Sequence, residues 1–205
     1  MKWMYLLVPL TVLGPSAGFA ATSPLQAFLT CDADSLAIVN QPGLKERIPS
    51  TEVNGKVRFS GGSKTSLGER WMFDTPITLE GVTLTGFFIE DQDLMGSRII
   101  GSGFYTQQAP DALYEQLKKM PSSQLESAHG IYARAQIWSH KQSGWVAENG
   151  DELAGKLVTD TAERVLMVEP AAAEVGHGSK GMITCSIQGN VTPAMLKTTR
   201  PDLIE

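Results

Sequence analysis

Cysteine and histidine are scarce in this chain of 205 residues, which holds two cysteines and three histidines. The histidines His129, His140 and His177 never stand at the i, i+4 spacing of a helical metal site. Two distant cysteines, Cys31 and Cys185, make a weak metal centre, and they are also too far apart for the usual redox-active pair. We therefore expect no metal site and no cofactor.

Catalytic and phosphate-binding motifs are missing as well. No G-x-S-x-G elbow and no S-x-x-K occurs, so an activated serine is not indicated. The glycine-rich runs at 61–65 and 178–181 lack the spacing of a P-loop. A run at 91–96 begins like a calcium loop, but Met95 fills a ligand position and Ser102 stands where an acidic residue should close it. A looser cation site using Glu90, Asp91 and Asp93 stays open.

The mature chain has little positive charge and few aromatic residues. Without residues 1–20 it holds 16 basic against 22 acidic side chains, a formal charge of −6, and aromatic residues make up 7% of the sequence. This sign opposes a phosphate backbone, so we expect no nucleic-acid partner. No apolar run after residue 21 approaches the roughly 20 residues of a membrane helix, so no membrane span is expected in the mature chain.

The N-terminus has the pattern of a secretory signal peptide over residues 1–20. Lys2 supplies the positive start, and a short apolar run follows from residue 4 to residue 13. Gly18 and Ala20 are the small residues that a signal peptidase reads, which places cleavage before Ala21. The sequence thus predicts an exported protein, periplasmic or extracellular.

In an oxidising compartment, Cys31 and Cys185 are expected to form one structural disulfide. Such a bridge closes a loop of roughly 155 residues, and in the chain-entropy model this is worth up to about 5 kcal/mol. The consequence is a covalent clasp between the first and last structured segments.

The apolar pattern predicts an α+β fold, with a mostly antiparallel sheet and a few short helices on one face. Helices are expected to begin at Pro24, Pro110 and Pro193, because proline favours the first helical position. A break at Glu80-Gly81 is interpreted as a bend or bulge between two strand patterns. Strands are predicted at 56–60, 69–73, 76–89, 98–105, 131–140, 157–161, 163–168 and 181–187, with turns at 141–144 and at Asn149-Gly150 and a surface loop at 171–180.

Residues 21–205 are expected to form a single domain, with a hypothesis of two related halves. The halves would cover about 31–120 and 129–205. In each, a strand leads to a short proline-started helix, at 109–113 and again at 192–196. The alternative is that the similarity of these two segments reflects only how common proline-started helices are.

Three classes of function remain after these exclusions. One is a small envelope hydrolase with a site built from His177 and acidic residues at strand ends, because glycoside chemistry needs paired carboxylates whose separation the sequence does not show. These strand-end acids are Glu80, Glu90, Glu148 and Glu169. The second class is a structural accessory of a surface assembly.

The sequence favours the third class, a binding protein rather than an enzyme. A sheet carrying aromatic side chains makes a rigid platform for a protein partner, and an acidic protein suits a partner with a basic surface. The function predicted is therefore an exported protein that acts by protein–protein contact, as an inhibitor or immunity-type partner of an envelope or secreted protein. The candidate binding residues are Trp71, Phe87, Phe88, Tyr132, Trp138, Trp145 and His177.

Overall fold

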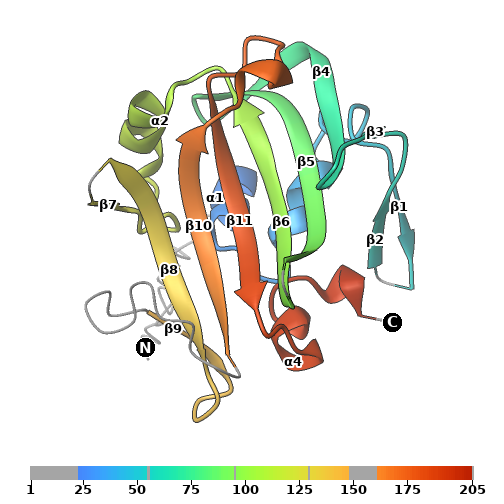
Figure 1. Cartoon of the computed structure of the whole chain (residues 1–205). Helices are drawn as coiled ribbons and strands as arrows, with labels where there is room; N and C mark the ends of the chain where they lie inside the picture. The colour runs from blue at the N-terminus through green and yellow to red at the C-terminus, as the bar shows by residue number, and fades with distance from the viewer. Residues whose placement is uncertain (1–22, 55, 95, 129, 148–160, 205) are drawn as a thin grey trace, which may run out of the picture.

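The computed structural model describes residues 23–54, 56–94, 96–128, 130–147 and 161–204. Within these residues nine strands form one antiparallel sheet in the order β3-β4-β5-β6-β11-β10-β8-β7, with β9 paired to β8 (Figure 1). The strands are β3 (Ser63–Lys64), β4 (Gly68–Leu79), β5 (Val82–Leu94), β6 (Ser97–Thr106), β7 (Glu126–Ala128), β8 (Ile131–Ser139), β9 (Gly144–Ala147), β10 (Ala162–Pro170) and β11 (Gly181–Gly189). A separate hairpin joins β1 (Ser50–Val53) to β2 (Lys56–Phe59).

The α-helices pack on one face of this sheet, the face that is turned away from the viewer in Figure 1. The helical elements are α1 (Pro24–Leu29), η1 (Ser35–Asn40), α2 (Pro110–Leu117), η2 (Ala173–Val175), α4 (Pro193–Lys197) and η3 (Pro201–Leu203). The 3-10 turn η2 differs from the α-helices, because its Val175 packs with Phe88 and Tyr105 on the opposite face. The result is a sheet-dominated α+β fold, and the predicted class is confirmed in this outline.

Helix α1 forms where the sequence predicts it. The Ser23 hydroxyl accepts a hydrogen bond from the backbone N–H of Gln26, and Pro24 occupies the first turn. Leu25, Phe28 and Leu29 lie on one face of the helix and are buried against the sheet. The helix is only six residues long, so its stability comes from this apolar face and from tertiary contacts rather than from helix propensity.

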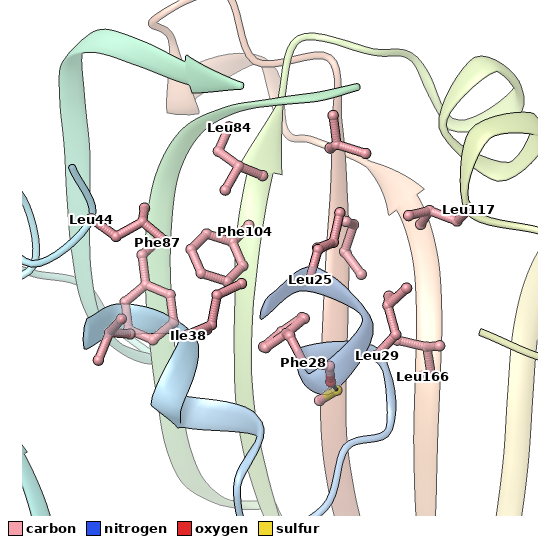
Figure 2. Packing of buried hydrophobic residues seen from close by; sticks show 14 of the residues in the cluster. Leu25, Phe28, Leu29, Ile38, Leu44, Leu84, Phe87, Phe104, Leu117 and Leu166 are labelled. Carbon is pink, nitrogen blue, oxygen red and sulfur yellow. Dashed lines mark hydrogen bonds between the residues drawn. The ribbon is translucent and has the colours of Figure 1, made fainter. Parts of the chain in front are cut away.

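The main core lies between the helices and the inner face of the sheet (Figure 2). Phe28 of α1 meets Phe104 of β6 edge to face, with ring centroids 5.1 Å apart. Phe87 of β5 packs on the other side of Phe104, also at 5.1 Å. Burying each of these rings contributes about 1.5–3 kcal/mol, which fixes the position of α1 at the middle of the sheet.

The chain reverses at Glu80-Gly81, so the predicted bend or bulge is wrong. Leu79 pairs with Val82, which leaves a two-residue hairpin loop between β4 and β5. Glu80 and Gly81 both have positive φ, at 52° and 84°, as a type I′ turn requires. The irregularity in this strand pair lies earlier in the chain, where the β4–β5 register shifts between Met72 and Ile77.

Most other predicted strands and helices are present, including the proline-started helices α2 and α4. The two predicted halves contribute to one sheet, where β6 pairs with β11, and their common origin stays a prediction. Several predictions fall outside the described residues: the signal peptide at 1–20, the turn at Asn149-Gly150, His129, Glu148 and nearly all of the strand at 157–161.

Candidate functional site

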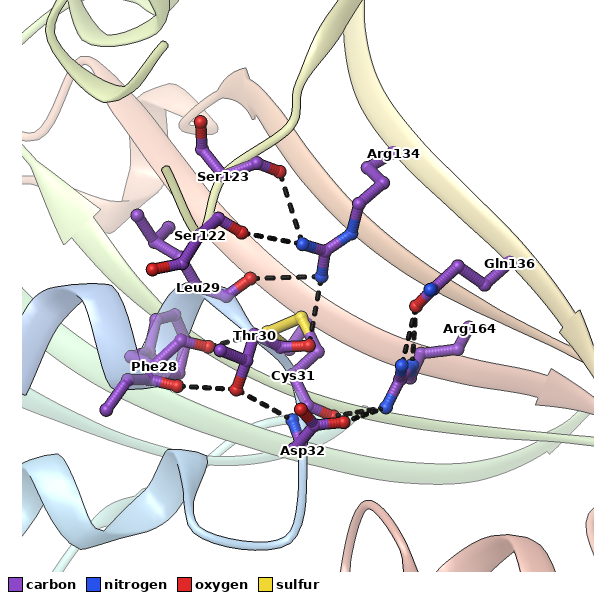
Figure 3. Close-up of a disulfide and its surroundings, with 12 residues drawn as sticks. Phe28, Leu29, Thr30, Cys31, Asp32, Ser122, Ser123, Arg134, Gln136 and Arg164 are labelled. Carbon is purple, nitrogen blue, oxygen red and sulfur yellow. Dashed lines mark hydrogen bonds and ion pairs between the residues drawn. A yellow bond between two sulfur atoms is a disulfide. The ribbon is translucent and has the colours of Figure 1, made fainter. Parts of the chain in front are cut away.

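The predicted disulfide between Cys31 and Cys185 is confirmed (Figure 3). It joins Cys31, two residues beyond the last residue of α1, to the central strand β11, with a Cα–Cα distance of 5.5 Å. Cys31 has a positive φ of 56° and follows the C-cap residue Thr30. Both cysteines are buried. The disulfide therefore links the N-terminal helix covalently to the middle of the sheet.

Two arginines that the sequence analysis did not single out complete this clasp. Arg134 of β8 donates hydrogen bonds to the carbonyl oxygens of Leu29 and Thr30, each at 3.0 Å, and also to those of Ser122 and Ser123. Burial lowers the pKa of Arg134, and the neighbouring charge of Arg164 lowers it further. The guanidinium thus satisfies carbonyls that the end of a helix leaves free.

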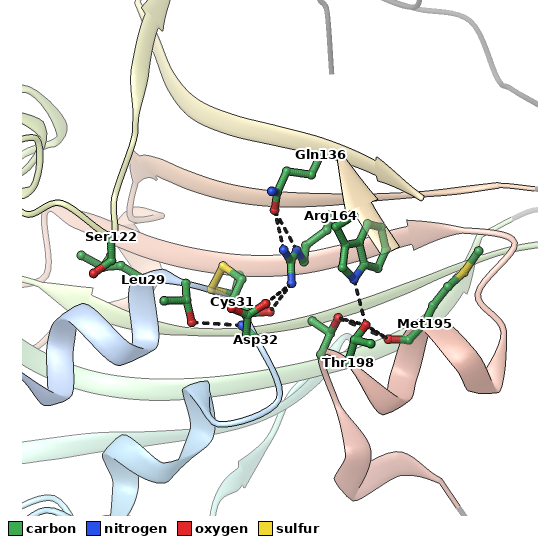
Figure 4. A network of polar contacts seen from close by, with 12 residues as sticks. Leu29, Cys31, Asp32, Ser122, Gln136, Arg164, Met195 and Thr198 are labelled. Atoms are coloured by element: carbon green, nitrogen blue, oxygen red, sulfur yellow. Dashed lines mark hydrogen bonds and ion pairs between the residues drawn. A yellow bond between two sulfur atoms is a disulfide. The ribbon is translucent and has the colours of Figure 1, made fainter. Parts of the chain in front are cut away.

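Arg164 of β10 completes the same network (Figure 4). It donates to the carbonyl of Cys31, to the carboxylate of Asp32 and to the side-chain oxygen of Gln136. Its guanidinium also lies 5.1 Å from the ring centroid of Trp145. Burial lowers the pKa of Arg164, while the Asp32 carboxylate opposes this shift. Each nitrogen of the Arg164 guanidinium donates to a group within the protein. The cluster of Arg164, Asp32 and Gln136 is therefore structural.

Four of the candidate aromatic residues are buried. Trp71 and Phe87 belong to the main core, and Trp138 belongs to a second cluster beside α4. Phe88 points to the other face of the sheet, but it is only 3% exposed because Tyr105 and Val175 pack on it. In this structure these four side chains present almost no surface to a partner.

The other three candidates are more accessible. Tyr132 stacks on Tyr114 with centroids 4.3 Å apart and donates to the carboxylate of Asp111. Trp145 is partly buried against Trp138. His177 is exposed in a tight turn with a φ of 52°, and no described carboxylate bonds to it. A role for these residues in binding stays a prediction.

The candidate site lies on what we call the open face, the side of the sheet opposite α1. Side chains alternate along a strand, so residues next to Cys185, Leu166 and Phe104 point to this side. Figure 1 is viewed from this side, and the 3-10 turn η2 lies on it, because its Val175 packs with Phe88 and Tyr105. Its residues include Ile131, Ala133, Ala135 and Ile137 of β8, Val165, Met167 and Glu169 of β10, Met182, Thr184 and Ser186 of β11, Gly101, Gly103 and Tyr105 of β6, and Phe88 and Glu90 of β5.

Two carboxylates, Glu90 and Glu169, stand out on this face. Both are partly buried, and among the described residues neither forms a hydrogen bond or an ion pair. Burial raises the pKa of Glu90, and the negative charge of Glu169 raises it further. Burial alone raises the pKa of Glu169. The two side chains therefore carry charge that the described part of the protein does not neutralise.

Tyr105 and Arg70 lie beside Glu90. Burial and the charge of Glu90 raise the pKa of the Tyr105 phenol, while Arg70 opposes the rise by its charge and by a hydrogen bond. Arg70 is thus hydrogen-bonded to the tyrosine.

Thr184 adds an unsatisfied group to the same area. It lies on β11 opposite Gly103, and it is 7% exposed. Its hydroxyl oxygen has no hydrogen-bond partner. Among the buried side-chain nitrogen and oxygen atoms of the described residues, only the Nε of Arg134 also lacks one. A buried polar group left unpaired costs free energy, so its presence calls for an explanation.

The remaining acidic candidates have structural partners. Glu80 accepts hydrogen bonds from the Ser23 hydroxyl and from the backbone N–H of Leu25, at the start of α1. Asp91 forms a two-pronged pair with Arg98, and Asp93 accepts from the backbone N–H of Gly96. No group of three or more metal-ligating side chains occurs in the part of the chain that the structure describes.

Comparison with known proteins gives no family for this chain: no family model, no curated protein and no solved structure matches it. Within the described ranges, no helix has the length and apolar character needed to cross a bilayer. The function must therefore be argued from the site alone.

Proposed function

We propose that this protein is exported and acts by binding another protein through the open face of its sheet, as an inhibitor or immunity-type partner of an envelope or secreted protein. The observation that carries the proposal is the composition of this face. Along β8 it bears an apolar row, Ile131, Ala133, Ala135 and Ile137, of which Ile131 is 58% exposed. An apolar strip bordered by charged groups is the usual make-up of a protein interface.

The inner side of β8 explains why the apolar row faces outward. Arg134 and Gln136 point toward α1, because they hold its carboxyl end and the Arg164 guanidinium. The same inner side also carries Tyr132 and the buried Trp138, so β8 has apolar side chains on both of its faces. The outward row is apolar area that a partner can cover.

The location and the partner follow from the same chain. A buried disulfide fits an oxidising compartment, and the signal-peptide pattern supports export. The formal charge of −6 after cleavage favours a partner with a basic surface, since complementary charge raises the association rate.

Affinity capture with the oxidised protein from residue 21 onward tests the proposal. Envelope and culture-supernatant fractions would be passed over the wild type, Ala135→Lys and Ala147→Lys. Ala135 lies on the open face, whereas Ala147 is exposed and pairs with Gln136, on the inward-facing register of β8. We expect a saturable partner that Ala147→Lys retains and Ala135→Lys loses. Equal capture by both variants would exclude the open face.

A second candidate function, a small carboxylate-dependent hydrolase, draws on Glu90 and Glu169. Two acids with raised pKa values near each other are the groups that glycoside chemistry uses. This candidate predicts hydrolysis of an envelope polysaccharide that Glu90→Gln abolishes. Absence of turnover by the oxidised wild type across glycan and peptide substrates would remove it.

A further inference from the structure

The predicted mature chain has three tyrosines, and two of them lie face to face. Of the four tyrosines in the sequence, Tyr5 falls within the predicted signal peptide, which leaves Tyr105, Tyr114 and Tyr132. Tyr114 of α2 and Tyr132 of β8 stack with ring centroids 4.3 Å apart and an interplanar angle of 11°. Carbon atoms of the two rings therefore lie close to van der Waals contact, which is about 3.5–4.0 Å.

Solvent reaches this stacked pair. Both rings are half-buried where α2 lies beside β8 (Figure 1), and the neighbouring Asp111 is exposed. Tyr105, by contrast, is only 8% exposed. A dissolved oxidant therefore meets Tyr114 and Tyr132 before it meets the third tyrosine.

Asp111 is placed to take the phenolic proton of Tyr132. Its carboxylate accepts a hydrogen bond of 2.8 Å from the Tyr132 hydroxyl. This hydrogen bond raises the pKa of the Tyr132 phenol, so the proton stays on the oxygen until an electron leaves the ring. A phenol loses an electron more easily when its proton moves to a base in the same step, and such a base must lie within hydrogen-bond reach.

Lys118 makes the two rings unequal. Its ammonium lies 5.2 Å from the ring centroid of Tyr114, where it is attracted by the electron-rich ring and disfavours removal of an electron from it. The carboxylate of Glu115, which pairs with Lys118, offsets part of this charge. Tyr132, whose hydroxyl is bound to Asp111, is therefore the ring that loses an electron first.

From this geometry we infer that Tyr114 and Tyr132 form an oxidative cross-linking site, at which a haem peroxidase acting with hydrogen peroxide joins the two rings as dityrosine and Asp111 accepts the first proton. The cross-link ties α2 covalently to β8. The inference is independent of the proposed function, because both tyrosines pack against the main core on the inner side of the sheet and not on the open face.

The reaction balances with hydrogen peroxide as the oxidant. Tyr132 gives one electron to the peroxidase and its phenolic proton to Asp111, and Tyr114 gives one electron to the peroxidase and its phenolic proton to water. The two phenoxyl radicals form a carbon–carbon bond between positions ortho to their oxygens. Each of these carbons then loses its hydrogen as a proton while the oxygen of the same ring regains one, which restores both phenols. Hydrogen peroxide takes up the two electrons and two protons and becomes two molecules of water.

Coupling also requires a movement of the rings. They must tilt out of the parallel stack, because the new bond joins ring edges rather than ring faces. Neither ring is enclosed, so rotation of the two side chains can supply this tilt.

The test is oxidation of the disulfide-bonded protein from residue 21 onward, in dilute solution, by a haem peroxidase with hydrogen peroxide. Photogenerated tris-bipyridine ruthenium(III) serves as a second, smaller oxidant. We expect a monomer with dityrosine fluorescence and a cross-linked pair of tryptic peptides that is two hydrogen atoms lighter than their sum. Tyr114→Phe and Tyr132→Phe should each abolish this product, whereas Tyr105→Phe should retain it. No cross-link with either oxidant, cross-links only between molecules, or an unchanged yield from Tyr114→Phe would overturn the site.

Matched variants test the part of Asp111. Asp111→Asn keeps an acceptor for the Tyr132 hydroxyl but is a far weaker base, so the initial rate of dityrosine formation near pH 7 should fall by about tenfold or more. Asp111→Glu should restore most of the rate. Asp74→Asn, which removes the same charge from an exposed position on β4, should leave it unchanged. Equal rates for Asp111→Asn and the wild type would overturn the assignment of Asp111 as the proton acceptor.

Discussion

Arg164 donates a hydrogen bond of 3.3 Å to the backbone carbonyl of Cys31, a residue 133 positions away in the sequence. The disulfide and the arginine network therefore both hold Cys31. Arg134 binds the two carbonyls just before this point, and the disulfide fixes the side chain. The end of α1 is held by covalent, ionic and hydrogen-bonded contacts at once, and this dense arrangement leads to specific expectations for stability.

Replacing Arg134 with methionine should destabilise the protein strongly. The variant keeps the apolar stem but leaves the carbonyls of Leu29, Thr30, Ser122 and Ser123 without their donor. We expect the free energy of unfolding to fall by about 2–4 kcal/mol, measured by urea denaturation with the disulfide intact. Arg58→Met, at an exposed position on β2, is the control and should change it by less than about 0.5 kcal/mol. Equal effects of the two changes would contradict a structural role for Arg134.

Removing the disulfide should also be costly. The double variant Cys31→Ala/Cys185→Ala releases a loop with a sequence separation of 154 residues. A loss of about 2–5 kcal/mol is expected from urea denaturation. Because the bridge and Arg134 hold the same helix end, combining this change with Arg134→Met should give a loss that differs from the sum of the separate losses. Strict additivity would show that the two devices act independently.

Two glycines of β6 provide a matched pair for the packing of the open face. A Cβ on Gly103 would lie 2.3 Å from the carbonyl oxygen of Ile183 and 2.4 Å from the Phe88 ring, whereas a Cβ on Gly101 meets only Glu90 at ordinary contact distance. Gly103→Ala should therefore lower the free energy of unfolding by about 3 kcal/mol or more, and Gly101→Ala by less than about 1 kcal/mol. Thermal denaturation of both variants checks this order, and a reversed order would contradict the close approach of Phe88.

Glu90→Gln/Glu169→Gln should stabilise the protein at neutral pH. Both carboxyl groups have a folded-state pKa above the ordinary value of 4.5. Since the folded state holds their protons more tightly, their favourable contribution is present below that value and is lost as pH rises through the folded pKa. The variant should therefore match the wild type near pH 4 and exceed it at pH 7.

The expected gain is modest because solvent partly screens both groups. It should amount to about 1–3 °C in Tm at pH 7. The measurement is a series of melting curves from pH 4 to pH 8 for the wild type, this variant and the surface control Glu52→Gln/Asp74→Asn. A gain that is equally large near pH 4 would show that burial of charge is not its cause.

Several local features could be predicted from the sequence because they depend on neighbouring residues. Ser23-Pro24 marks the start of α1, and the alternation over 131–139 marks β8. The sequence did not reveal the turn at Glu80-Gly81, because glutamate is not a usual residue at positive φ. The side chain of Glu80 explains its presence, since it caps α1 from a distance of 55 residues along the chain.

The site was less predictable than the strands. Glu90 and Glu169 were among the strand-end acids, but their proximity depends on β5, β6, β11 and β10 being neighbours in one sheet. The aromatic residues are predicted as binding residues because their type is common at interfaces, yet Trp71, Phe87, Phe88 and Trp138 are buried. Residue type indicates that a side chain has a large apolar area, but it does not tell which surface covers that area.

The sequence by itself determined the disulfide as the natural use of two cysteines, the α+β class and the position of most elements, whereas export stays a prediction. These depend on composition and on periods of two or 3.6 residues, which act over a short span of chain. Only the tertiary structure decided which face of β8 points inward, that Arg134 and Arg164 hold the end of α1, and that Glu90, Glu169 and Thr184 lie on the same face of the sheet. Such relations arise from strand order and register, because pairing brings together residues whose separation in sequence carries no local signal.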